Sequence, residues 1–264
     1  MNMDYLKMNK NYWNSRVEAH AESEFYSMEQ FMAGGSSLKW IELEHLPADL
    51  TGKKILHLQC HFGQDTLSLA RMGAEVTGVD LSDEAIKKAD SLAKELELKA
   101  TFVNCDVYDS PNHIHEKFDM VFTTYGTIGW LPDLDKWAEV INHFLKPGGE
   151  FLIAEFHPAV WMFDDDFKEV KYSYFNVEPI QEITDGTYTD KGDSIKEEFT
   201  GWNHHLGEVF QALQGQQLSI KSFQEYDTSP WPCFNHLTKV ENGWQINGLE
   251  GKLPLVYALQ CTKK

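Results

Sequence analysis

The residues best placed to do chemistry lie between Ile55 and Asp80. This run has the pattern of an apolar strand, a tight turn at Gly63, a short helix and a second strand that ends on the carboxylate of Asp80. A carboxylate at a strand end can hold the hydroxyls of a ribose, while the turn backbone approaches the rest of a nucleoside. The run therefore predicts a site for a nucleoside cofactor. Alternatively, Asp80 only caps the helix that follows Ser82.

The elements that must position this site alternate along the middle of the chain. Apolar runs predict five strands, at residues 54–58, 75–79, 101–104, 118–123 and 150–155. Helical patterns separate them. Ser82 is the expected N-cap of one helix, whose apolar stripe starts at Ile86, and a second helix with an apolar stripe ends at Leu145. Strands that alternate with helices are typical of a parallel sheet with crossover helices.

The pattern changes after Phe156. Residues 158–200 are acidic and aromatic, with alternating apolar positions at 170–174 and a turn signal at Asp185-Gly186, and they predict a β-rich insertion. A helix then follows at 206–213, with strands at 218–224 and 253–260 and a hairpin signal at Asn242-Gly243 between them. We expect one domain with three parts: an N-terminal helical cap (1–45), a core (46–157 and 201–264) and an insertion or lid (158–200).

Charge and cysteine content narrow the class of protein. The net charge of -18 repels phosphate backbones, so we expect a small-molecule partner and no nucleic acid. The four cysteines show no paired spacing that would indicate zinc or a disulfide framework, and we expect no metal. The chain has neither a signal-peptide pattern nor an apolar run long enough to span a membrane. We expect a cytoplasmic monomer or homodimer.

The order of strand, turn, helix, strand and acid resembles motif I and the following acidic position of class I S-adenosylmethionine-dependent methyltransferases. Motif I is usually D-x-G-x-G-x-G, and the matching run here places His57 where the acid is usual and Gln59 and His61 where glycines are usual. The later matches are Asn104-Cys105-Asp106-Val107 at the third strand, Phe118 to Thr123 at the fourth, and Leu145 to Ile153 leading into the fifth.

This resemblance implies an α/β fold with a Rossmann-like, doubly wound sheet of seven strands, mostly parallel with an antiparallel last strand. It also implies S-adenosyl-L-methionine as the cofactor, with Asp80 on the ribose and Asp106 on the adenine, although Asp106 could be only a turn former. The leading helix would close over the cofactor, or its aromatic residues simply pack together. The expected cofactor contacts are Tyr12, Trp13, Arg16, Gln59, Cys60, His61, Gly63, Asp80, Leu81, Cys105, Asp106, Val107, Thr124 and Tyr125.

The acceptor side is predicted from loops that leave the carboxyl ends of the strands. Methyl transfer mainly needs alignment of the acceptor, and it needs a base only if the acceptor arrives protonated. His157 follows the fifth strand, and His204 and His205 begin the last crossover helix; these three and Tyr125 are the candidate bases. Candidate substrate contacts are Trp130, Trp161, Trp202 and Trp231. The insertion would cover the acceptor, or else form a dimer surface.

The function that we expect is methyl transfer to an oxygen, nitrogen or sulfur atom of a small organic acceptor. The departures at His57, Gln59 and His61 leave open a non-catalytic sensor or scaffold that binds the same nucleoside. A nicotinamide-dependent oxidoreductase is the other alternative. The bulky Gln59 and His61 argue against it, because they stand where a pyrophosphate needs glycine.

Overall fold

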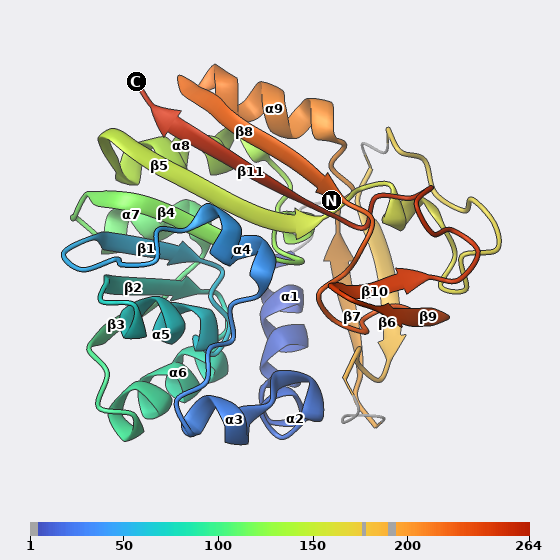
Figure 1. Ribbon diagram of the computed structural model, residues 1–264, viewed down its shortest axis with the longest axis horizontal. Coiled ribbons are helices and arrows are strands. Elements are labelled where there is room, and N and C mark those ends of the chain that lie inside the picture. Colours follow the sequence, from blue (N-terminus) through green and yellow to red (C-terminus); the bar gives the residue numbers. More distant parts are fainter. Residues whose placement is uncertain (1–4, 176–177, 190–193) are drawn as a thin grey trace.

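A sheet of seven strands forms the centre of the molecule, in the order β3-β2-β1-β4-β5-β11-β8 (Figure 1). The strands from β3 to β5 are parallel, and β11 runs antiparallel to both β5 and β8. This confirms the predicted doubly wound fold. The computed structural model describes residues 5–175, 178–189 and 194–264. The sheet consists of β1 (Lys54–Leu58), β2 (Glu75–Asp80), β3 (Ala100–Asn104), β4 (Phe118–Thr124), β5 (Leu145–Phe156), β8 (Leu218–Tyr226) and β11 (Val256–Lys263).

The predicted strands of the sheet are all present. Strand β3 begins one residue earlier than predicted, and two others start several residues away from the predicted position. Strand β5 begins at Leu145 rather than at residue 150, because Leu145 pairs with Phe118 before a shift in register. Strand β11 begins at Val256 rather than at residue 253, which agrees with the absence of an N–H donor on Pro254.

Helices cover both faces of the sheet because successive residues of a strand point to opposite sides. On β4, Val121 belongs to the same buried cluster as Trp137, whereas Phe122 belongs to a cluster that contains Leu69. Ser82 caps its helix as predicted, since its Oγ accepts the Ala85 N–H at 3.0 Å. The helices of the core are α5 (Gln64–Arg71), α6 (Asp83–Glu95), α7 (Ser110–His113), α8 (Leu134–Phe144) and α9 (Leu206–Gly215).

Within residues 5–45 the structure has four α-helices and one short 3₁₀ helix (Glu24–Tyr26). The α-helices are α1 (Tyr5–Asn14), α2 (Val17–Ala21), α3 (Met28–Met32) and α4 (Trp40–His45). Helix α1 contacts both α6 of the core and strand β7 of the insertion. None of the helices among the described residues is both long enough and apolar enough to cross a membrane.

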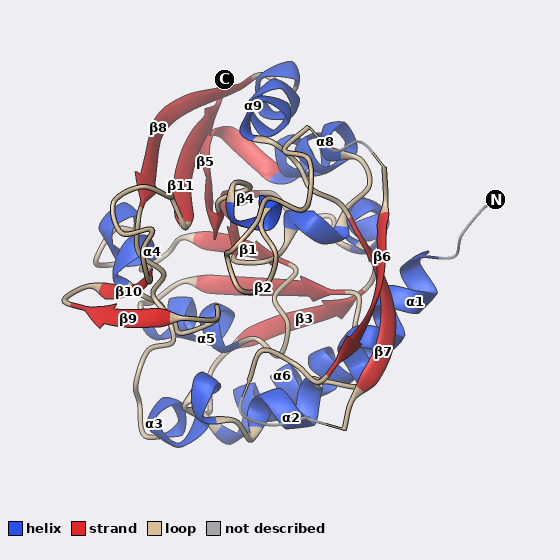
Figure 2. Cartoon of the chain, turned by 90° about the vertical axis from the view of Figure 1, so that its right-hand side faces the viewer, coloured by secondary structure: helices blue, strands red, loops and turns tan. Residues whose placement is uncertain are grey.

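Two small hairpins lie beyond the carboxyl ends of the parallel strands (Figures 1 and 2). One pairs β6 (Ile180–Asp185) with β7 (Lys196–Gly201) inside the predicted insertion. The other pairs β9 (Leu237–Val240) with β10 (Gly243–Ile246), where the hairpin signal predicted it. The alternating residues at 170–174 form no strand; only Val170 makes an isolated bridge, with Phe163.

Candidate functional site

The turn after β1 has an unusual backbone conformation. The φ angles of Gln59, His61 and Gly63 are 57°, 49° and 81°. A left-handed conformation costs a residue with a Cβ about 1–2 kcal/mol, which gives a physical reason for glycines at such positions. Here hydrogen bonds hold the substituted residues: the His61 N–H donates to Asp80 Oδ2 at 2.7 Å, and Gln59 Nε2 donates to the Thr127 carbonyl at 2.8 Å. The turn therefore keeps its shape without the usual glycines.

Two carboxylates lie at neighbouring strand ends. Asp80 Oδ1 accepts the Ser82 N–H at 2.8 Å, and Asp106 Oδ1 accepts the Tyr108 N–H at 3.3 Å. Burial raises the pKa of Asp80 to about 6, although the N–H groups of Ser82 and His61 favour the charged form. Burial also raises the pKa of Asp106. Both side chains thus have the turn-forming contacts of the alternative interpretation, and both also line a cavity.

That cavity, which we call the smaller cavity, has a volume of about 90 Å³. The ends of β2 and β3 supply one wall, and helix α1 supplies another. Its volume is below the roughly 300–1,000 Å³ of ligand pockets, so a nucleoside needs α1 to move outward. The wall residues are Asp80, Leu81, Cys105, Asp106 and Val107 from the strand ends, and Tyr5, Leu6, Asn9 and Trp13 from α1.

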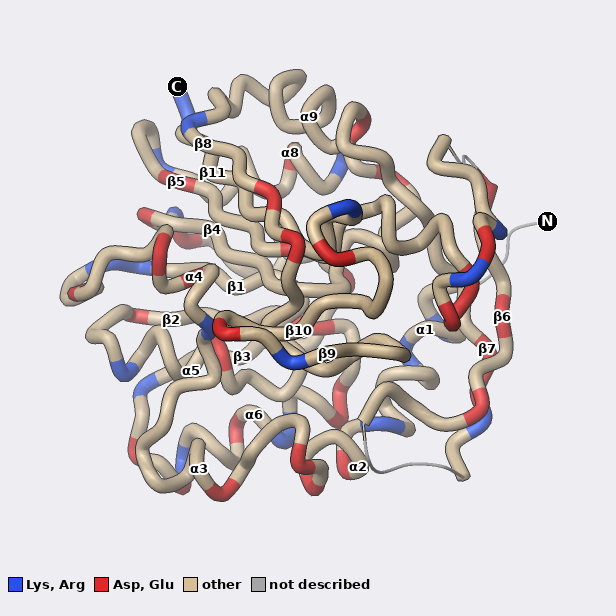
Figure 3. Tube along the Cα trace, turned by 45° about the vertical axis from the view of Figure 1, so that its right-hand side comes forward, with Lys and Arg blue, Asp and Glu red and all other residues tan. Residues whose placement is uncertain are grey.

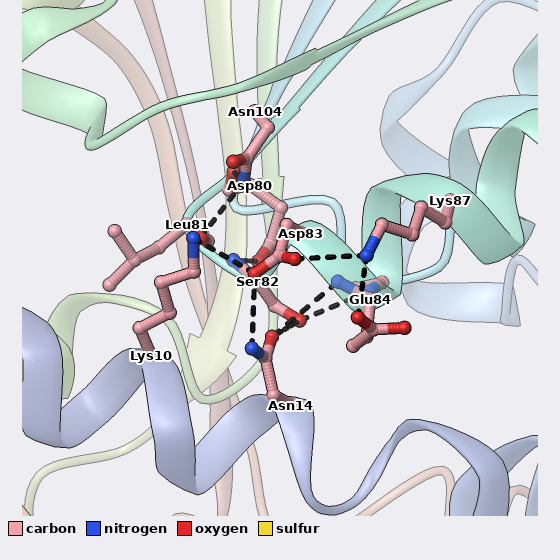
Figure 4. Close-up of polar contacts among 10 residues, drawn as sticks. Lys10, Asn14, Asp80, Leu81, Ser82, Asp83, Glu84, Lys87 and Asn104 are labelled. Atoms are coloured by element: carbon pink, nitrogen blue, oxygen red, sulfur yellow. Dashed lines mark hydrogen bonds and ion pairs between the residues drawn. The ribbon is translucent and has the colours of Figure 1, made fainter.

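Helix α1 is bound to the core at the end of β2 (Figure 4). Asn14 Nδ2 donates to Asp83 Oδ1 at 3.0 Å, Ser82 Oγ donates to Asn14 Oδ1 at 2.6 Å, and Lys10 Nζ lies 2.8 Å from Asp83 Oδ1. Figure 4 shows these side chains converging from α1 and from the start of α6. The cover of the smaller cavity is therefore fixed next to Asp80.

Helix α1 is also bound to the insertion. The buried Asn9 side chain donates to the Thr200 carbonyl at 2.8 Å and accepts the Thr200 N–H at 2.9 Å. The guanidinium of Arg16, just after α1, donates to Thr184 Oγ1 at 2.6 Å and to the Gly186 carbonyl at 3.1 Å. One helix thus joins the core to the β6–β7 hairpin.

The larger cavity has a volume of about 880 Å³, within the range of small-molecule pockets. Its walls come from the Gln59–Gly63 turn, the N-terminal segment around α3, the residues after β4 and β5, the β6–β7 hairpin, and residues 231–235. Gln59, His61, Tyr125 and Gly126 line both cavities. This junction lies between the ends of β1 and β4, where the strand order reverses and ligands of such sheets bind.

A buried pair of acidic groups lies beside the junction. The Tyr125 hydroxyl donates to Glu42 Oε2 at 2.9 Å, and Glu42 is fully buried on α4. Burial, and then the charge of Asp65, raises the pKa of Glu42 to about 8. Burial and the neighbouring Glu42 raise the pKa of Tyr125 well above its ordinary value. When Glu42 is ionised, above about pH 8, a proton released near the Tyr125 hydroxyl has a route to it.

A second polar group lies on the wall of the larger cavity. Asp65 Oδ1 accepts the Ser37 hydroxyl at 2.6 Å, and its Oδ2 accepts the Thr124 hydroxyl at 2.9 Å. His57 Nδ1 lies 2.8 Å from Thr66 Oγ1, and burial lowers the pKa of His57 to about 4. His57 is therefore neutral at physiological pH.

Glu155, at the end of β5, organises the loop that lines both cavities. Its buried carboxylate accepts the Thr127 N–H at 2.7 Å, the Thr127 hydroxyl at 2.9 Å and the Ile128 N–H at 3.3 Å. Hydrogen bonds from several N–H groups to one carboxylate are strong. Glu155 also accepts the Gly126 N–H on its Oε1, so it fixes Gly126 directly and the neighbouring Tyr125 through it.

Two imidazoles, of the buried His20 and the half-buried His61, connect the turn to the N-terminal segment. His20 Nδ1 lies 3.1 Å from His61 Nε2, and His20 Nε2 lies 2.7 Å from Thr187 Oγ1. Burial, together with the Arg16 charge, lowers the pKa of His20 to about 3, and burial also lowers that of His61. Both rings are neutral, and they act as a packed, hydrogen-bonded support for the turn.

The cavities bring together most of the predicted ligand contacts. Tyr12, Cys60, Gly63, Thr124, Trp161 and Trp231 line the larger cavity, Trp13, Leu81, Cys105, Val107 and Trp130 line the smaller one with the two aspartates, and Gln59, His61 and Tyr125 line both.

Five predicted residues lie outside both cavities. Arg16 binds the hairpin as described above, and the Trp202 ring packs 5.3 Å from that of Tyr5. His157 Nε2 lies 2.9 Å from Glu225 Oε1 and its Nδ1 accepts the Ala159 N–H. His204 Nε2 lies 2.7 Å from the Leu131 carbonyl.

His205 caps α9, since its Nδ1 accepts the Glu208 N–H at 3.1 Å. The three histidines predicted as bases therefore have partners within the fold and do not face the junction. Across the described ranges, no cluster of three or more His, Cys, Asp or Glu side chains is arranged to hold a metal ion.

The sequence interpretation did not select His20, Glu42, Asp65 or Glu155. His20 and Glu42 belong to N-terminal helices that carry no motif, and nothing local marks them as buried. Glu155 did have a signal, because an acid at the end of an otherwise apolar strand points to a polar role at the carboxyl edge of the sheet.

Comparison with known proteins gives a consistent result. Residues 55–149 match the family model described as a methyltransferase domain. An uncharacterized methyltransferase of Synechocystis sp. is 34% identical over 134 residues, which cover 50% of this chain and 60% of that protein. A ubiquinone biosynthesis O-methyltransferase of Paraburkholderia phymatum is 34% identical over 112 residues, 42% of this chain and 47% of that protein. The chain thus matches only about half of the length of these relatives.

Solved structures share the fold over the whole chain. The geranyl diphosphate C-methyltransferase of Streptomyces coelicolor A3(2), solved with Mg²⁺, geranyl diphosphate and S-adenosyl-L-homocysteine, has a TM-score of 0.62 at 14% identity. The alignment covers 100% of this chain and 99% of that one. At this identity the likeness concerns the fold, which is that of class I methyltransferases.

Proposed function

We propose that this chain, whose residues 55–149 are a methyltransferase domain within a class I methyltransferase fold, transfers a methyl group from S-adenosylmethionine to a small organic acceptor. The observation that best supports this is the junction of the two cavities. Acidic strand ends suited to a nucleoside line one cavity, an acceptor-sized space adjoins it, and Gln59, His61, Tyr125 and Gly126 lie between them.

The residues of the smaller cavity fit the cofactor chemically. Asp80 is the proposed acceptor for the ribose hydroxyls, and Asp106 faces the adenine. Gln59 Oε1 is buried and has no hydrogen-bond partner within the described part of the chain, so it can accept a donor from the ligand's amino-acid end. When bound, S-adenosylmethionine supplies an electrophilic methyl group on a sulfonium.

The remaining chemistry belongs to side chains at the junction. The turn and the loop after β4 align the acceptor with the methyl group. Helix α1, once it has moved outward to admit the cofactor and closed over it again, excludes water. Tyr125 is the predicted base that lines the junction. Where Glu42 is ionised, above its pKa of about 8, Tyr125 accepts the acceptor's proton on its oxygen while its own hydroxyl proton passes to Glu42. The methylated atom is proposed to be oxygen, nitrogen or sulfur, and the O-methyltransferase relative supports oxygen.

Calorimetric titration with S-adenosylhomocysteine tests the cofactor assignment. Asp80→Asn should weaken binding about tenfold or more, because charge-assisted bonds to the ribose are lost. Asp90→Asn, on α6 and in neither cavity wall, is the control. Because the pKa of Asp80 is about 6, native binding should weaken about tenfold between about pH 8 and pH 5 as the carboxylate is protonated. Absence of binding, or an Asp80→Asn variant that binds like the native chain, refutes the proposal.

A further inference from the structure

The larger cavity contains an aromatic cluster that belongs to the acceptor side alone. We define this cluster as Phe156, Trp161, Phe163, Phe167 and Phe234, which all line the larger cavity and not the smaller one. The Phe156 ring lies 5.7 Å from Trp161 and 5.4 Å from Phe234, and Phe167 lies 5.7 Å from Phe234. The rings come from the end of β5 and from the segments after β5 and after β8. The apolar part of an acceptor can therefore bind against this aromatic cluster.

The charge on the same cavity wall is negative. Among the described residues that line it, Asp65, Asp164, Asp165, Glu182 and Asp185 carry carboxylates, and Lys39 is the single Lys or Arg. Figure 3 shows acidic positions along β6 and β7 and on the nearby loops.

The histidines of the cavity wall do not offset this charge. Burial lowers the pKa of His57 to about 4, and it also lowers that of His61. Lys39 Nζ lies 5.4 Å above the ring of Trp231. An anionic acceptor would thus meet one ammonium and several carboxylates.

Asp164 links the negative charge to the aromatic cluster. It lies between Phe163 and Phe167 in the chain, and its Oδ1 accepts the Lys168 N–H at 2.7 Å, which fixes the carboxylate on the wall. Glu182 faces the same space from β6, and its Oε1 accepts the Tyr172 hydroxyl at 2.5 Å. Aromatic faces attract cations, and carboxylates beside them add to that attraction.

Anion recognition without a metal ion needs the opposite composition. Carboxylates and phosphates are held by arginine forks, lysines and backbone N–H groups. The structural relative was solved with a diphosphate together with Mg²⁺, an ion that bridges phosphates to carboxylates. Here the described residues contain no cluster of three or more side chains arranged to hold a metal ion, and the described part of the cavity wall offers a single lysine. The shared fold therefore does not imply a shared class of acceptor.

We propose that the acceptor is an organic cation, an amine on an aromatic or alkyl body, with the body in the aromatic cluster and the ammonium facing Asp164 and Glu182. This inference rests on the proposed methyltransferase function. It gives Asp164 and Glu182 the role of selecting the acceptor by charge.

The test compares three probes that share a 4-hydroxyphenyl skeleton: tyramine (cationic), tyrosol (neutral) and 4-hydroxyphenylacetate (anionic). Each is titrated calorimetrically into the full chain, alone and saturated with S-adenosylhomocysteine. Tyramine should bind about tenfold or more tightly than 4-hydroxyphenylacetate, with tyrosol between them. Asp164→Asn and Glu182→Gln should each reduce this ratio, because each removes one charge at nearly constant shape. Asp166→Asn, adjacent but not on the cavity wall, should leave it unchanged.

The inference is wrong if 4-hydroxyphenylacetate binds as tightly as tyramine, if tyramine does not bind, or if neither charge-removing variant alters the ratio. Failure of S-adenosylhomocysteine to bind would overturn the proposed function instead. Binding of S-adenosylhomocysteine without a preference for the cation overturns this inference alone.

Discussion

Replacing Glu42 with glutamine should change the pH dependence of folding stability. Glu42 is fully buried, its Oε2 accepts the Tyr125 hydroxyl, and its Oε1 has no partner among the described residues. Asp65, Tyr125 and Tyr226 are the titratable groups near it. Burial raises its pKa from 4.5 to about 8.

The sign follows from proton linkage. Between about pH 4.5 and 8 the folded chain holds a proton on Glu42 that the unfolded chain releases, so stability falls as pH rises through this window. The difference between the two pKa values corresponds to at most about 5 kcal/mol, less where water enters or the site relaxes. Glu42→Gln does not titrate. At about pH 5 it should equal the native chain or be about 1–3 kcal/mol less stable, because its amide needs a new acceptor.

At about pH 9 the same variant should be more stable than the native chain, by about 2 kcal/mol or more. Urea unfolding followed by tryptophan fluorescence at several pH values measures this difference. Glu44→Gln, two residues away and exposed, is the matched control and should shift little with pH. If Glu42→Gln and the native chain differ by the same free energy at pH 5 and at pH 9, the reasoning about a neutral buried carboxyl is wrong.

Two further predictions concern the cofactor side. Gly63→Ala should destabilise the chain by about 1–2 kcal/mol or more and weaken S-adenosylhomocysteine binding, because φ is +81° and a Cβ would lie 2.8 Å from the Phe102 ring; an unchanged melting temperature would contradict this. Asn9→Ala should speed proteolysis within α1 and weaken the same ligand, since two buried hydrogen bonds to Thr200 are lost. Limited digestion with intact-mass analysis checks it, and a native-like cleavage rate would count against it.

The sheet could be predicted from sequence because its signals are local. Apolar runs, the Ser82 cap and the Asn242-Gly243 turn each act over a few residues, and a parallel sheet places the ends of its strands together. The cofactor contacts predicted from strand ends line the cavities for that reason. The start of β5 was predicted wrongly because Leu145 belongs to the strand through its pairing with Phe118 of β4, and the residues next to it in the sequence do not indicate that pairing.

The acceptor side could not be predicted in the same way. Whether His157 or His204 faces a cavity depends on Glu225 and Leu131, which are distant in the sequence. The burial of Glu42 likewise depends on packing of the N-terminal segment against the core. Loops and the N-terminal segment determine these contacts, and no periodic pattern in the sequence indicates them.

The double attachment of α1 has a kinetic consequence. Asn14 binds the helix to the core beside Asp80, and Asn9 binds it to the hairpin that walls the acceptor cavity. Displacing α1 therefore disturbs both compartments at once. We expect the spent cofactor and the methylated product to leave through one shared opening. A single slow motion of α1, and not two independent motions, would then limit the turnover rate.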